Sequence, residues 1–380
     1  MALKTVEGSF AVAETVKNCE PDVVACYPIT PSTHIAEDLD RMYADGELRN
    51  FIAVESEFSA ISTLIGASAA GARTFTATSS QGLALMHEAL FNASGMRLPI
   101  VMCVANRALS APLNIWNDHQ DTISERDAGW LQIYCESNQE TVDTIIQAYR
   151  ISEKALIPSM VCMDGFFLTH AVEQIDVPEK ELIARFLPKL DLKIKLDAGN
   201  PLSLGVYAAP EDYQYFREDF ANDMLKAKEE VVRTHDEWAK LTGRKYGNGL
   251  WEEYRCEDEE YLFVGMGSAL GNAKVAVDNL RKSGKKVGAL RVRLFRPFPK
   301  EVARVLEGKK SVVVFEKALC PGSDAPLFTE LKSALCEQSK HAPKMFSMVG
   351  GLGGSDVPVH TIEEIFNKMM KGEPPAPFIY

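Results

Sequence analysis

Short apolar runs alternate with helical patterns along the first half of this 380-residue chain. The apolar runs have the length and composition of buried strands and lie at residues 23–29, 50–54, 74–78 and 99–105. Apolar residues at helical spacing mark the segments around them, at residues 7–19, 34–42, 58–71 and 83–94. Strands that alternate with helices pair in parallel, because each helix returns the chain to the same end of the sheet. The sequence therefore predicts an α/β fold with a doubly wound parallel sheet.

The alternation continues on a smaller scale in the second half. A helix at 141–153 and a strand at 158–167 come first, then a polar, proline-interrupted connection at 173–200 and a long charged helix at 211–241. Further strand and helix patterns follow at residues 261–265, 271–282, 286–295, 310–316 and 326–338. We expect two domains: residues 1–248, with a core at about 1–175 and a connecting arm, and a smaller α/β domain at 249–380.

The composition excludes several classes of function. The net charge is −12, which disfavours a nucleic-acid-binding face or an anionic membrane surface. The eight cysteines include no C-x-x-C pair, so neither a zinc ribbon nor a ferredoxin-type iron–sulfur run is present in the sequence. The start of the chain has no signal-peptide pattern, and no apolar run is long enough to span a membrane. We expect a cytoplasmic protein with reduced thiols.

Two acidic residues lie where the second predicted strand passes into a helix rich in small residues. Glu55 and Glu57 are separated by one serine. Carboxylates at the carboxyl end of a parallel strand lie where open α/β sheets bind ligands. An acidic side chain also stabilises a helix N-terminus electrostatically, so this position alone leaves both interpretations open.

Polar side chains follow each of the four predicted strands. Thr30, Glu57, Ser79 to Gln81 and Arg107 all come directly after a strand. Because the carboxyl ends of parallel strands meet at one edge of a sheet, we expect these residues to form the rim of one site. Thr30 followed by Pro31 also predicts a helix start, with Thr30 as the N-cap.

Three further segments allow a functional and a plain structural interpretation. Residues 111–129 form a long polar loop in which Asp118 and His119 lack the spacing of a metal motif, so we expect no metal site in this chain. The glycines of residues 265–271 resemble a dinucleotide fingerprint, but their spacing is wrong and a tight strand-to-helix turn is favoured. Residues 350–354 (GGLGG) predict a flexible turn at a ligand or a subunit edge.

Several of these segments together resemble one family. Residues 27–33 (YPITPST), 55–60 (ESEFSA), 78–82 (TSSQG) and 107–110 (RALS), in this order, are similar to the alpha subunit of multi-subunit pyruvate:ferredoxin oxidoreductases, also called pyruvate synthases. Residues 126–130 (RDAGW), 293–299 (RLFRPFP) and 350–354 extend the resemblance over nearly the whole chain.

The resemblance implies a pyrimidine-binding thiamine-diphosphate domain followed by a domain like the C-terminal domain of transketolase. The holoenzyme would convert pyruvate, coenzyme A and oxidised ferredoxin reversibly to acetyl-CoA, carbon dioxide and reduced ferredoxin. Glu57 corresponds to the glutamate that contacts the aminopyrimidine ring, and Thr30 and Arg107 correspond to residues that hold the substrate. Ser80 and Gln81 are expected to contact the cofactor as well. Glu55 is expected at a strand end or a partner contact, because the chain turns into a helix between the two acids.

The Gly-Asp-Gly diphosphate motif of thiamine enzymes is absent from the sequence, as are cysteine clusters. We therefore expect partner subunits of beta, gamma and delta type to bind the diphosphate with Mg²⁺ and to contain the iron–sulfur clusters. Ferredoxin and coenzyme A would act through the complex, and the chain alone would be inactive. Alternatives are the alpha subunit of a 2-oxoisovalerate or other 2-oxoacid oxidoreductase and a scaffold subunit with a non-catalytic site. A nicotinamide dehydrogenase would require a phosphate-binding glycine turn that the sequence lacks.

Overall fold

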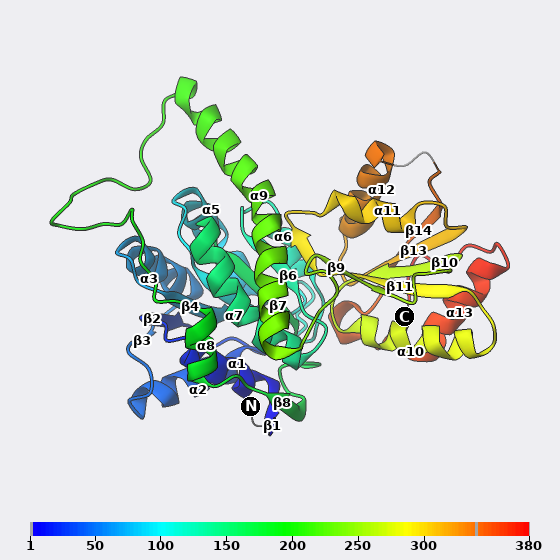
Figure 1. Cartoon of the computed structure of the whole chain (residues 1–380), viewed down its shortest axis with the longest axis horizontal. Coiled ribbons are helices and arrows are strands. Elements are labelled where there is room, and N and C mark those ends of the chain that lie inside the picture. Colours follow the sequence, from blue (N-terminus) through cyan, green and yellow to red (C-terminus); the bar gives the residue numbers. More distant parts are fainter. Residues whose placement is uncertain (1–2, 339–340, 380) are drawn as a thin grey trace.

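The computed structural model, which describes residues 3–338 and 341–379, contains two main β-sheets side by side (Figure 1). The larger sheet has seven strands in the order β12-β6-β7-β5-β4-β2-β3. Six of these strands are parallel: β2 (Val23–Cys26), β3 (Phe51–Ala53), β4 (Thr74–Thr78), β5 (Val101–Asn106), β6 (Leu131–Tyr134) and β7 (Ser159–Asp164). The predicted α/β fold class is confirmed.

Helices cover both faces of the larger sheet. On one face lie α1 (Gly8–Asn18), α2 (Thr33–Ala44) and α7 (Asn138–Ala155), and on the other lie α3 (Glu57–Ala69), α4 (Ser80–Leu85) and α5 (His87–Gly95). Strand β5 shows why both faces are apolar: Met102 and Val104 join one core cluster, whereas Val101, Cys103 and Ala105 join the other. A central strand buried on both sides needs such a continuous apolar run.

The smaller sheet has five strands in the order β14-β13-β10-β11-β9. Its strands are β9 (Trp251–Tyr254), β10 (Tyr261–Gly265), β11 (Val287–Val292), β13 (Ser311–Glu316) and β14 (Lys344–Val349), and only β9 is antiparallel to its neighbour. Helices α10 (Ala269–Lys282) and α13 (Val359–Met370) pack on one face, and α11 (Ala303–Leu306) and α12 (Pro326–Gln338) pack on the other.

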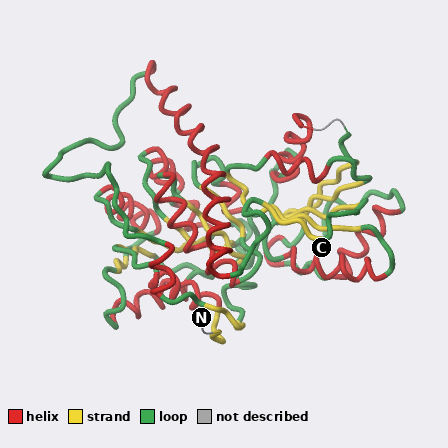
Figure 2. Tube along the Cα trace, in the orientation of Figure 1, coloured by secondary structure: helices red, strands yellow, loops and turns green. Residues whose placement is uncertain are grey.

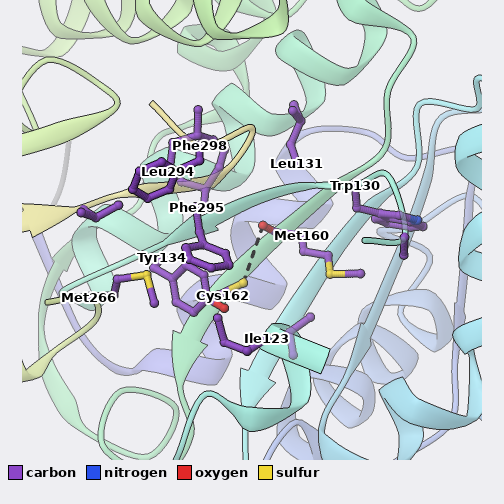
Figure 3. Close-up of a cluster of buried hydrophobic side chains, with 14 of the residues drawn as sticks. Ile123, Trp130, Leu131, Tyr134, Met160, Cys162, Met266, Leu294, Phe295 and Phe298 are labelled. Atoms are coloured by element: carbon purple, nitrogen blue, oxygen red, sulfur yellow. Dashed lines mark hydrogen bonds between the residues drawn. The ribbon is translucent and has the colours of Figure 1, made fainter. Parts of the chain in front are cut away.

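A short strand joins the two sheets. Strand β12 (Leu294–Arg296) directly follows β11 but pairs antiparallel with β6 of the larger sheet. The Phe295 ring meets the Tyr134 ring edge-on, with centroids 6.2 Å apart. Figure 3 shows Leu294, Phe295 and Phe298 packed beside Tyr134 in one continuous apolar cluster. One apolar cluster therefore extends across both sheets.

Outside the sheets, β1 (Leu3–Glu7) and β8 (Val172–Asp176) form a two-stranded antiparallel sheet, followed by α8 (Lys180–Phe186). The long helix α9 (Pro210–Thr242) packs through its C-terminal half, where Val231, His235 and Trp238 are buried. Its N-terminal end projects away from both sheets, together with the preceding loop (Figure 2). None of the helices in the described ranges is long and apolar enough to cross a membrane.

Several element boundaries differ from the sequence prediction. Helix α2 begins at Thr33 with Ser32 as the N-cap, so the predicted cap at Thr30 is wrong. The Ser32 backbone N–H bonds the Ile29 carbonyl, which makes a turn at Thr30 and Pro31 and delays the helix. The predicted strand at 286–295 divides into β11 and β12, and the helix at 83–94 divides at Met86 into α4 and α5. The long loop contains a short helix, α6 (Gln120–Ser124), and η1 (Lys300–Val302) and η2 (Leu352–Gly354) are single 3₁₀ turns.

Candidate functional site

Glu57 is buried at the start of α3. The Ser56 side chain caps this helix by accepting a hydrogen bond of 3.2 Å from the Ser59 backbone N–H. This cap places the Glu57 carboxylate against α4, and the Glu57 residue is only 6% exposed. A Cβ atom added to Gly82 would lie 2.4 Å from Glu57 Oε1 and 2.6 Å from Thr78 Oγ1. Glycine at position 82 is therefore what leaves room for the carboxylate.

Glu57 and Glu55 have opposite electrostatic environments. Burial raises the pKa of Glu57, although its own backbone N–H partly offsets this effect. In the described part of the chain, no other residue donates a hydrogen bond to the Glu57 side chain. Glu55 is exposed, and a hydrogen bond from the Ser59 hydroxyl lowers its pKa. Burial thus shifts Glu57 toward its protonated form, and the Ser59 hydrogen bond shifts Glu55 toward its charged form.

Arg107 is buried directly after β5, and two of its donor groups are already engaged. Its Nη1 donates to the Thr30 carbonyl at 2.9 Å, and its Nε donates to the Asn114 carbonyl at 3.0 Å. Burial lowers the pKa of the Arg107 guanidinium, and the charge of Asp121 acts in the opposite direction. Nη2 has no protein partner among the described residues. The Thr30 side chain is exposed, so the two residues meet through the Thr30 backbone and not through its hydroxyl.

Ser80 and Gln81 form the first turn of α4, at the end of β4. The Ser80 hydroxyl donates to the Ala108 carbonyl at 2.5 Å and lies 2.7 Å from Gln81 Oε1. Ser80 has a positive φ of 48°, an unusual value for a residue other than glycine. Its backbone N–H donates to Asp121 Oδ2 at 3.0 Å.

Asp121 holds two of the strand-end turns together. The same Oδ2 atom accepts the Arg107 backbone N–H at 3.0 Å, and Oδ1 accepts Asn106 Nδ2 at 2.8 Å. Asp121 is 1% exposed, and burial raises its pKa to about 6 while these hydrogen bonds act against the rise. Asp121 lies in the long polar loop at residues 111–129, and its sequence context predicted no role for it. A buried carboxylate that accepts backbone N–H groups from two turns fixes both turns in place.

Thr30, Ser80, Gln81 and Arg107 thus lie at one edge of the larger sheet, linked through Ala108, Asp121 and the Thr30 carbonyl. Glu57 reaches the same edge through its contact with Gly82.

Two sequence profiles match the chain that forms this edge. Residues 14–236 match "Pyruvate flavodoxin/ferredoxin oxidoreductase, thiamine diP-bdg", and residues 259–362 match "Pyruvate:ferredoxin oxidoreductase core domain II". The chain belongs to the pyruvate:ferredoxin oxidoreductase family.

Curated relatives in this family are similar over almost their full length. Pyruvate synthase subunit PorA of Methanosarcina barkeri is 48% identical over 96% of this chain and 92% of its own. The subunit of the same name from Thermotoga maritima is 45% identical over 97% of this chain and 94% of its own. Ketoisovalerate oxidoreductase subunit VorA of Pyrococcus horikoshii is 43% identical, with the same coverage as the Thermotoga protein.

Solved structures support the fold of the pyruvate:ferredoxin oxidoreductase family. A 2-oxoglutarate:ferredoxin oxidoreductase from Magnetococcus marinus superposes with a TM-score of 0.74 at 19% identity, covering 96% of this chain and 65% of that one. A split-gene transketolase superposes with a TM-score of 0.58 at 11% identity, covering 97% and 99%. At these identities the similarity concerns the fold alone.

The residues at the edge fit the thiamine diphosphate implied by the first profile. Glu57 presents a carboxyl group without another protein donor in the described chain. The neighbouring Thr78 Oγ1 and Ser79 Oγ atoms are buried and have no hydrogen-bond partner in the described part of the chain. Buried polar atoms without partners are uncommon in folded proteins and mark places where a ligand or water completes the bonding. An aminopyrimidine offers the donors and acceptors that this group of atoms lacks.

Asp118 and His119 do not meet as metal ligands. His119 Nε2 lies 2.7 Å from Asp164 Oδ1, whereas Asp118 accepts the Gln120 backbone N–H at 3.0 Å and the Gly353 backbone N–H at 3.3 Å. Asp164 Oδ2 pairs with Lys317 Nζ at 2.8 Å, and this oxygen also accepts the Ser268 backbone N–H at 3.2 Å. These contacts with Asp164, Lys317 and Gly353 hold the 111–129 loop against the smaller sheet.

Both glycine-rich turns of the smaller sheet touch this loop. A Cβ atom on Gly267 would lie 2.9 Å from His119 Nε2, and one on Gly354 would lie 2.5 Å from the Trp116 Cβ. Gly354 also donates its backbone N–H to the Asn117 carbonyl at 2.7 Å. In this structure the two turns allow close packing against the loop, which agrees with the structural interpretation of residues 265–271.

Proposed function

We propose that this chain is the alpha subunit of a thiamine-diphosphate-dependent pyruvate:ferredoxin oxidoreductase. The observation that supports this proposal most strongly is the Glu57 carboxyl group, buried beside the unpartnered Thr78 and Ser79 hydroxyls at the ligand-binding edge of a parallel sheet. The near full-length similarity to pyruvate synthase subunits supports pyruvate as the substrate. The complex would form acetyl-CoA, carbon dioxide and two reduced ferredoxins from pyruvate, coenzyme A and two oxidised ferredoxins.

In this proposal Glu57 acts on the pyrimidine ring of the cofactor. Thiamine diphosphate, when bound, would supply a nucleophilic thiazolium carbon and an electron sink for decarboxylation of a 2-oxoacid. Burial raises the pKa of Glu57, and a protonated Glu57 carboxyl would donate a hydrogen bond to a ring nitrogen. Glu57 would thereby hold a proton at that ring nitrogen and support the base function that the aminopyrimidine would supply.

Arg107 and Thr30 bind the substrate in this proposal. Arg107 Nη2 is free of protein partners among the described residues, and its guanidinium is fixed by two backbone carbonyls. A fixed guanidinium with free N–H groups suits the carboxylate of a 2-oxoacid. The exposed Thr30 hydroxyl would donate a further hydrogen bond to the substrate. Ser80 and Gln81 precede Gly82 in the first turn of α4, and from there they would contact the cofactor.

Partner subunits complete the enzyme in this proposal. Beta, gamma and delta subunits would bind the diphosphate with Mg²⁺ and hold the iron–sulfur clusters, since the sequence has motifs for neither. Exposed apolar side chains mark surfaces that a partner covers. Five large ones that follow the strand ends are each more than one third exposed, which supports a subunit interface there: Tyr27, Phe58, Leu113, Ile115 and Trp116. Ferredoxin and coenzyme A would bind elsewhere in the complex, which we place in the cytoplasm.

A branched-chain 2-oxoacid is the alternative substrate, because the ketoisovalerate subunit is only slightly less similar than the pyruvate synthase subunits. The test is ferredoxin reduction by the co-expressed, anaerobically purified complex, with coenzyme A and pyruvate, 2-oxoisovalerate or 2-oxoglutarate. We expect the highest kcat/KM with pyruvate and no activity or iron in the chain purified alone. A higher kcat/KM with 2-oxoisovalerate would assign the alternative substrate, and an inactive but fully assembled complex would favour a scaffold.

A further inference from the structure

Three side chains that could bind a metal ion come together at the start of α2. Glu7 ends β1, His34 lies in the first turn of α2, and His170 follows β7. One ligand atom from each lies within 4.8 Å of the other two. His34 Nδ1 lies 2.7 Å from Glu7 Oε1, and the two imidazole centroids are 4.8 Å apart. These residues come from three distant segments, which is why sequence spacing did not reveal them.

His170 is held in an orientation that suits a ligand. Its Nδ1 lies 2.7 Å from Thr169 Oγ1, and its ring packs against the Phe166 ring with centroids 4.7 Å apart. When Nδ1–H donates to this hydroxyl, the Nε2 atom keeps its lone pair free. Metal-binding histidines are commonly oriented by such a hydrogen bond from the other ring nitrogen.

The surroundings of the cluster favour a positive ion. Glu37 and Asp38, on the same helix as His34, add negative charge beside the imidazole. All three side chains of the cluster are partly exposed, so an ion could enter from solvent without unfolding the chain. Arg41, the basic residue on the same helix, already pairs with Asp38 at 2.8 Å.

We propose that Glu7, His34 and His170 form a binding site for Zn²⁺ or a similar divalent transition-metal ion. Two imidazoles and one carboxylate match the ligand preference of zinc, whereas Mg²⁺ and Ca²⁺ prefer oxygen ligands. Bonds of about 2.1 Å in tetrahedral geometry place ligand atoms about 3.4 Å apart. The ligand atoms, which lie within 4.8 Å of one another, must therefore approach by at most about 1.4 Å. His34 Nδ1 and Glu7 Oε1, now 2.7 Å apart, must separate by about 0.7 Å, and rotation of partly exposed side chains can supply both shifts.

The bound ion would connect three segments near the turn at Thr30 and Pro31, where the substrate is proposed to bind. Glu7 belongs to β1 of the β1–β8 sheet, His34 belongs to α2, and His170 belongs to the turn that begins at Gly165. A Cβ atom on Gly165 would lie 2.6 Å from Pro31 Cγ, so this turn packs directly against the residue that follows Thr30. Three protein ligands leave a fourth position for water or for a side chain of a partner subunit. This site is independent of the proposed function, because it uses none of the residues assigned to the cofactor or the substrate.

The experiment is a Zn²⁺ titration of the metal-stripped, full-length chain against a chromophoric chelator, with Co²⁺ absorption as a second probe. The variants are His34→Ala, His170→Ala and their combination, with Glu7→Gln as a variant that keeps the side-chain shape. His360→Ala is the matched control, since His360 is an exposed histidine on α13 of the smaller sheet. Circular dichroism verifies that each variant is folded.

We expect one Zn²⁺ per wild-type chain and a d–d spectrum of tetrahedral Co²⁺. Each single variant should weaken Zn²⁺ binding by at least about tenfold, because even outer partners of metal ligands contribute about 10–100-fold. The double variant should lose the site, and His360→Ala should keep it. Failure of the wild-type chain to bind Zn²⁺, or equal binding by the double variant, would overturn the proposal and leave His34 and Glu7 as a simple ion pair.

Discussion

At the scale of single residues, two glutamates separated by one serine have opposite properties. Glu57 is buried against Gly82, whereas Glu55 is exposed and bonded to Ser59. The difference arises because the backbone changes from strand to helix between them, at the Ser56 cap. Strand alternation alone would have directed both side chains to the same face.

Replacing Glu57 tests its assignment to the cofactor. Glu57→Gln keeps the shape but cannot exchange a proton, so turnover of the assembled complex should fall by about 10²–10⁴-fold, the usual contribution of general acid–base catalysis. Hydrogen–deuterium exchange at the thiazolium C2 measures the step directly. Glu55→Gln is the control and should exchange normally. Normal exchange in Glu57→Gln with slow exchange in Glu55→Gln would reverse the assignment.

Gly82 provides an independent test of the same position. Gly82→Ala would place a Cβ atom 2.4 Å from Glu57 Oε1, which forces the carboxyl group to move. We expect lower kcat and weaker thiamine diphosphate binding in the complex. Gly66→Ala is the matched control, because Gly66 lies inside α3 with no atom within 4 Å of its added Cβ. This control should be slightly more stable, by up to about 1 kcal/mol, with unchanged activity. Equal activity of the two variants would contradict the packing argument.

Arg107→Lys tests the substrate contact. An ammonium group cannot reproduce the planar fork of the guanidinium or its two bonds to the Thr30 and Asn114 carbonyls. Losing a charged hydrogen bond costs about 1.5–3 kcal/mol, so kcat/KM for pyruvate should fall roughly tenfold to over a hundredfold. Steady-state kinetics with saturating coenzyme A and ferredoxin give this value. An unchanged pyruvate dependence would remove Arg107 from the substrate site.

The sequence predicted the positions of the site residues but not the contacts between them. Thr30, Glu57, Ser80 and Arg107 were expected at one edge because each follows a parallel strand. Asp121 was missed, because the backbone N–H groups that it accepts belong to Ser80 and Arg107, which are distant in sequence. Sequence patterns contain little information on which buried carboxylate will bond two separate turns.

At the scale of elements, strands and helices with strong periodicity were predicted closely. Strand β4 and helix α12 have the predicted bounds, and α9 differs by one residue at each end. Strands β6 and β14 and helix α13 were missed, as were β1 and β8. Strands β1 and β8 are mostly exposed, so the period-two apolar signal of a half-buried strand is weak there. Strand β6 is only four residues long, too short to show a period.

Helix α9 carries a testable dependence of stability on pH. Burial lowers the pKa of His235 to about 4, and the charge of Arg293 acts in the same direction. Its Nε2 accepts the Tyr246 backbone N–H at 3.0 Å, which only the neutral ring can do. The unfolded chain binds a proton at His235 from about pH 6.5 downward, whereas the folded chain does not until about pH 4. This residue therefore contributes full stability above pH 6.5, and the contribution is lost as the pH falls to about 4.

His235→Gln removes this titration. Urea unfolding of wild type and variant between pH 7 and pH 4.5 should show that the wild-type advantage shrinks on acidification, by up to about 3 kcal/mol over the whole window. His360→Gln on α13 is the control, because His360 is exposed. A difference between wild type and His235→Gln that does not change with pH would show that His235 is not held neutral.

At the scale of the whole molecule, the two sheets behave as one folded body. Strand β12 extends the larger sheet although it follows β11 of the smaller one, and the apolar core is continuous between them (Figure 3). Arg291 of β11 and Arg293, which lies between β11 and β12, are both 1% exposed and donate hydrogen bonds to Glu140 of α7. Lys228 of the long helix α9 pairs with Glu301 of the second half at 2.8 Å, and the glycine turns at 265–271 and 350–354 pack against the 111–129 loop of the first half.

A buried polar group also joins the two halves of the chain: Asp164 bonds both His119 and Lys317. Burial disfavours the charged form of Asp164, but Lys317 and His119 outweigh this effect and hold its pKa well below the usual range. Lys317→Met would leave Asp164 buried without its cation at 2.8 Å, and breaking a buried pair in this way costs about 3–5 kcal/mol. Lys332→Met, which breaks an exposed pair with Asp324, should cost at most about 1 kcal/mol.

Two measurements test whether the Asp164–Lys317 pair joins the two halves of the chain or whether Lys317→Met only destabilises its immediate surroundings. Urea unfolding should show that Asp164→Asn/Lys317→Met is less destabilised than the sum of the single variants, because the double variant leaves no uncompensated charge. Hydrogen exchange at the Ser268 amide, which donates to Asp164 from the smaller sheet, should accelerate in Lys317→Met and not in Lys332→Met. If Lys317→Met and Lys332→Met unfold at the same urea concentration with the same Ser268 exchange, the polar group does not hold the loop to the smaller sheet. The continuous apolar core and β12 would then account for the union of the two sheets on their own.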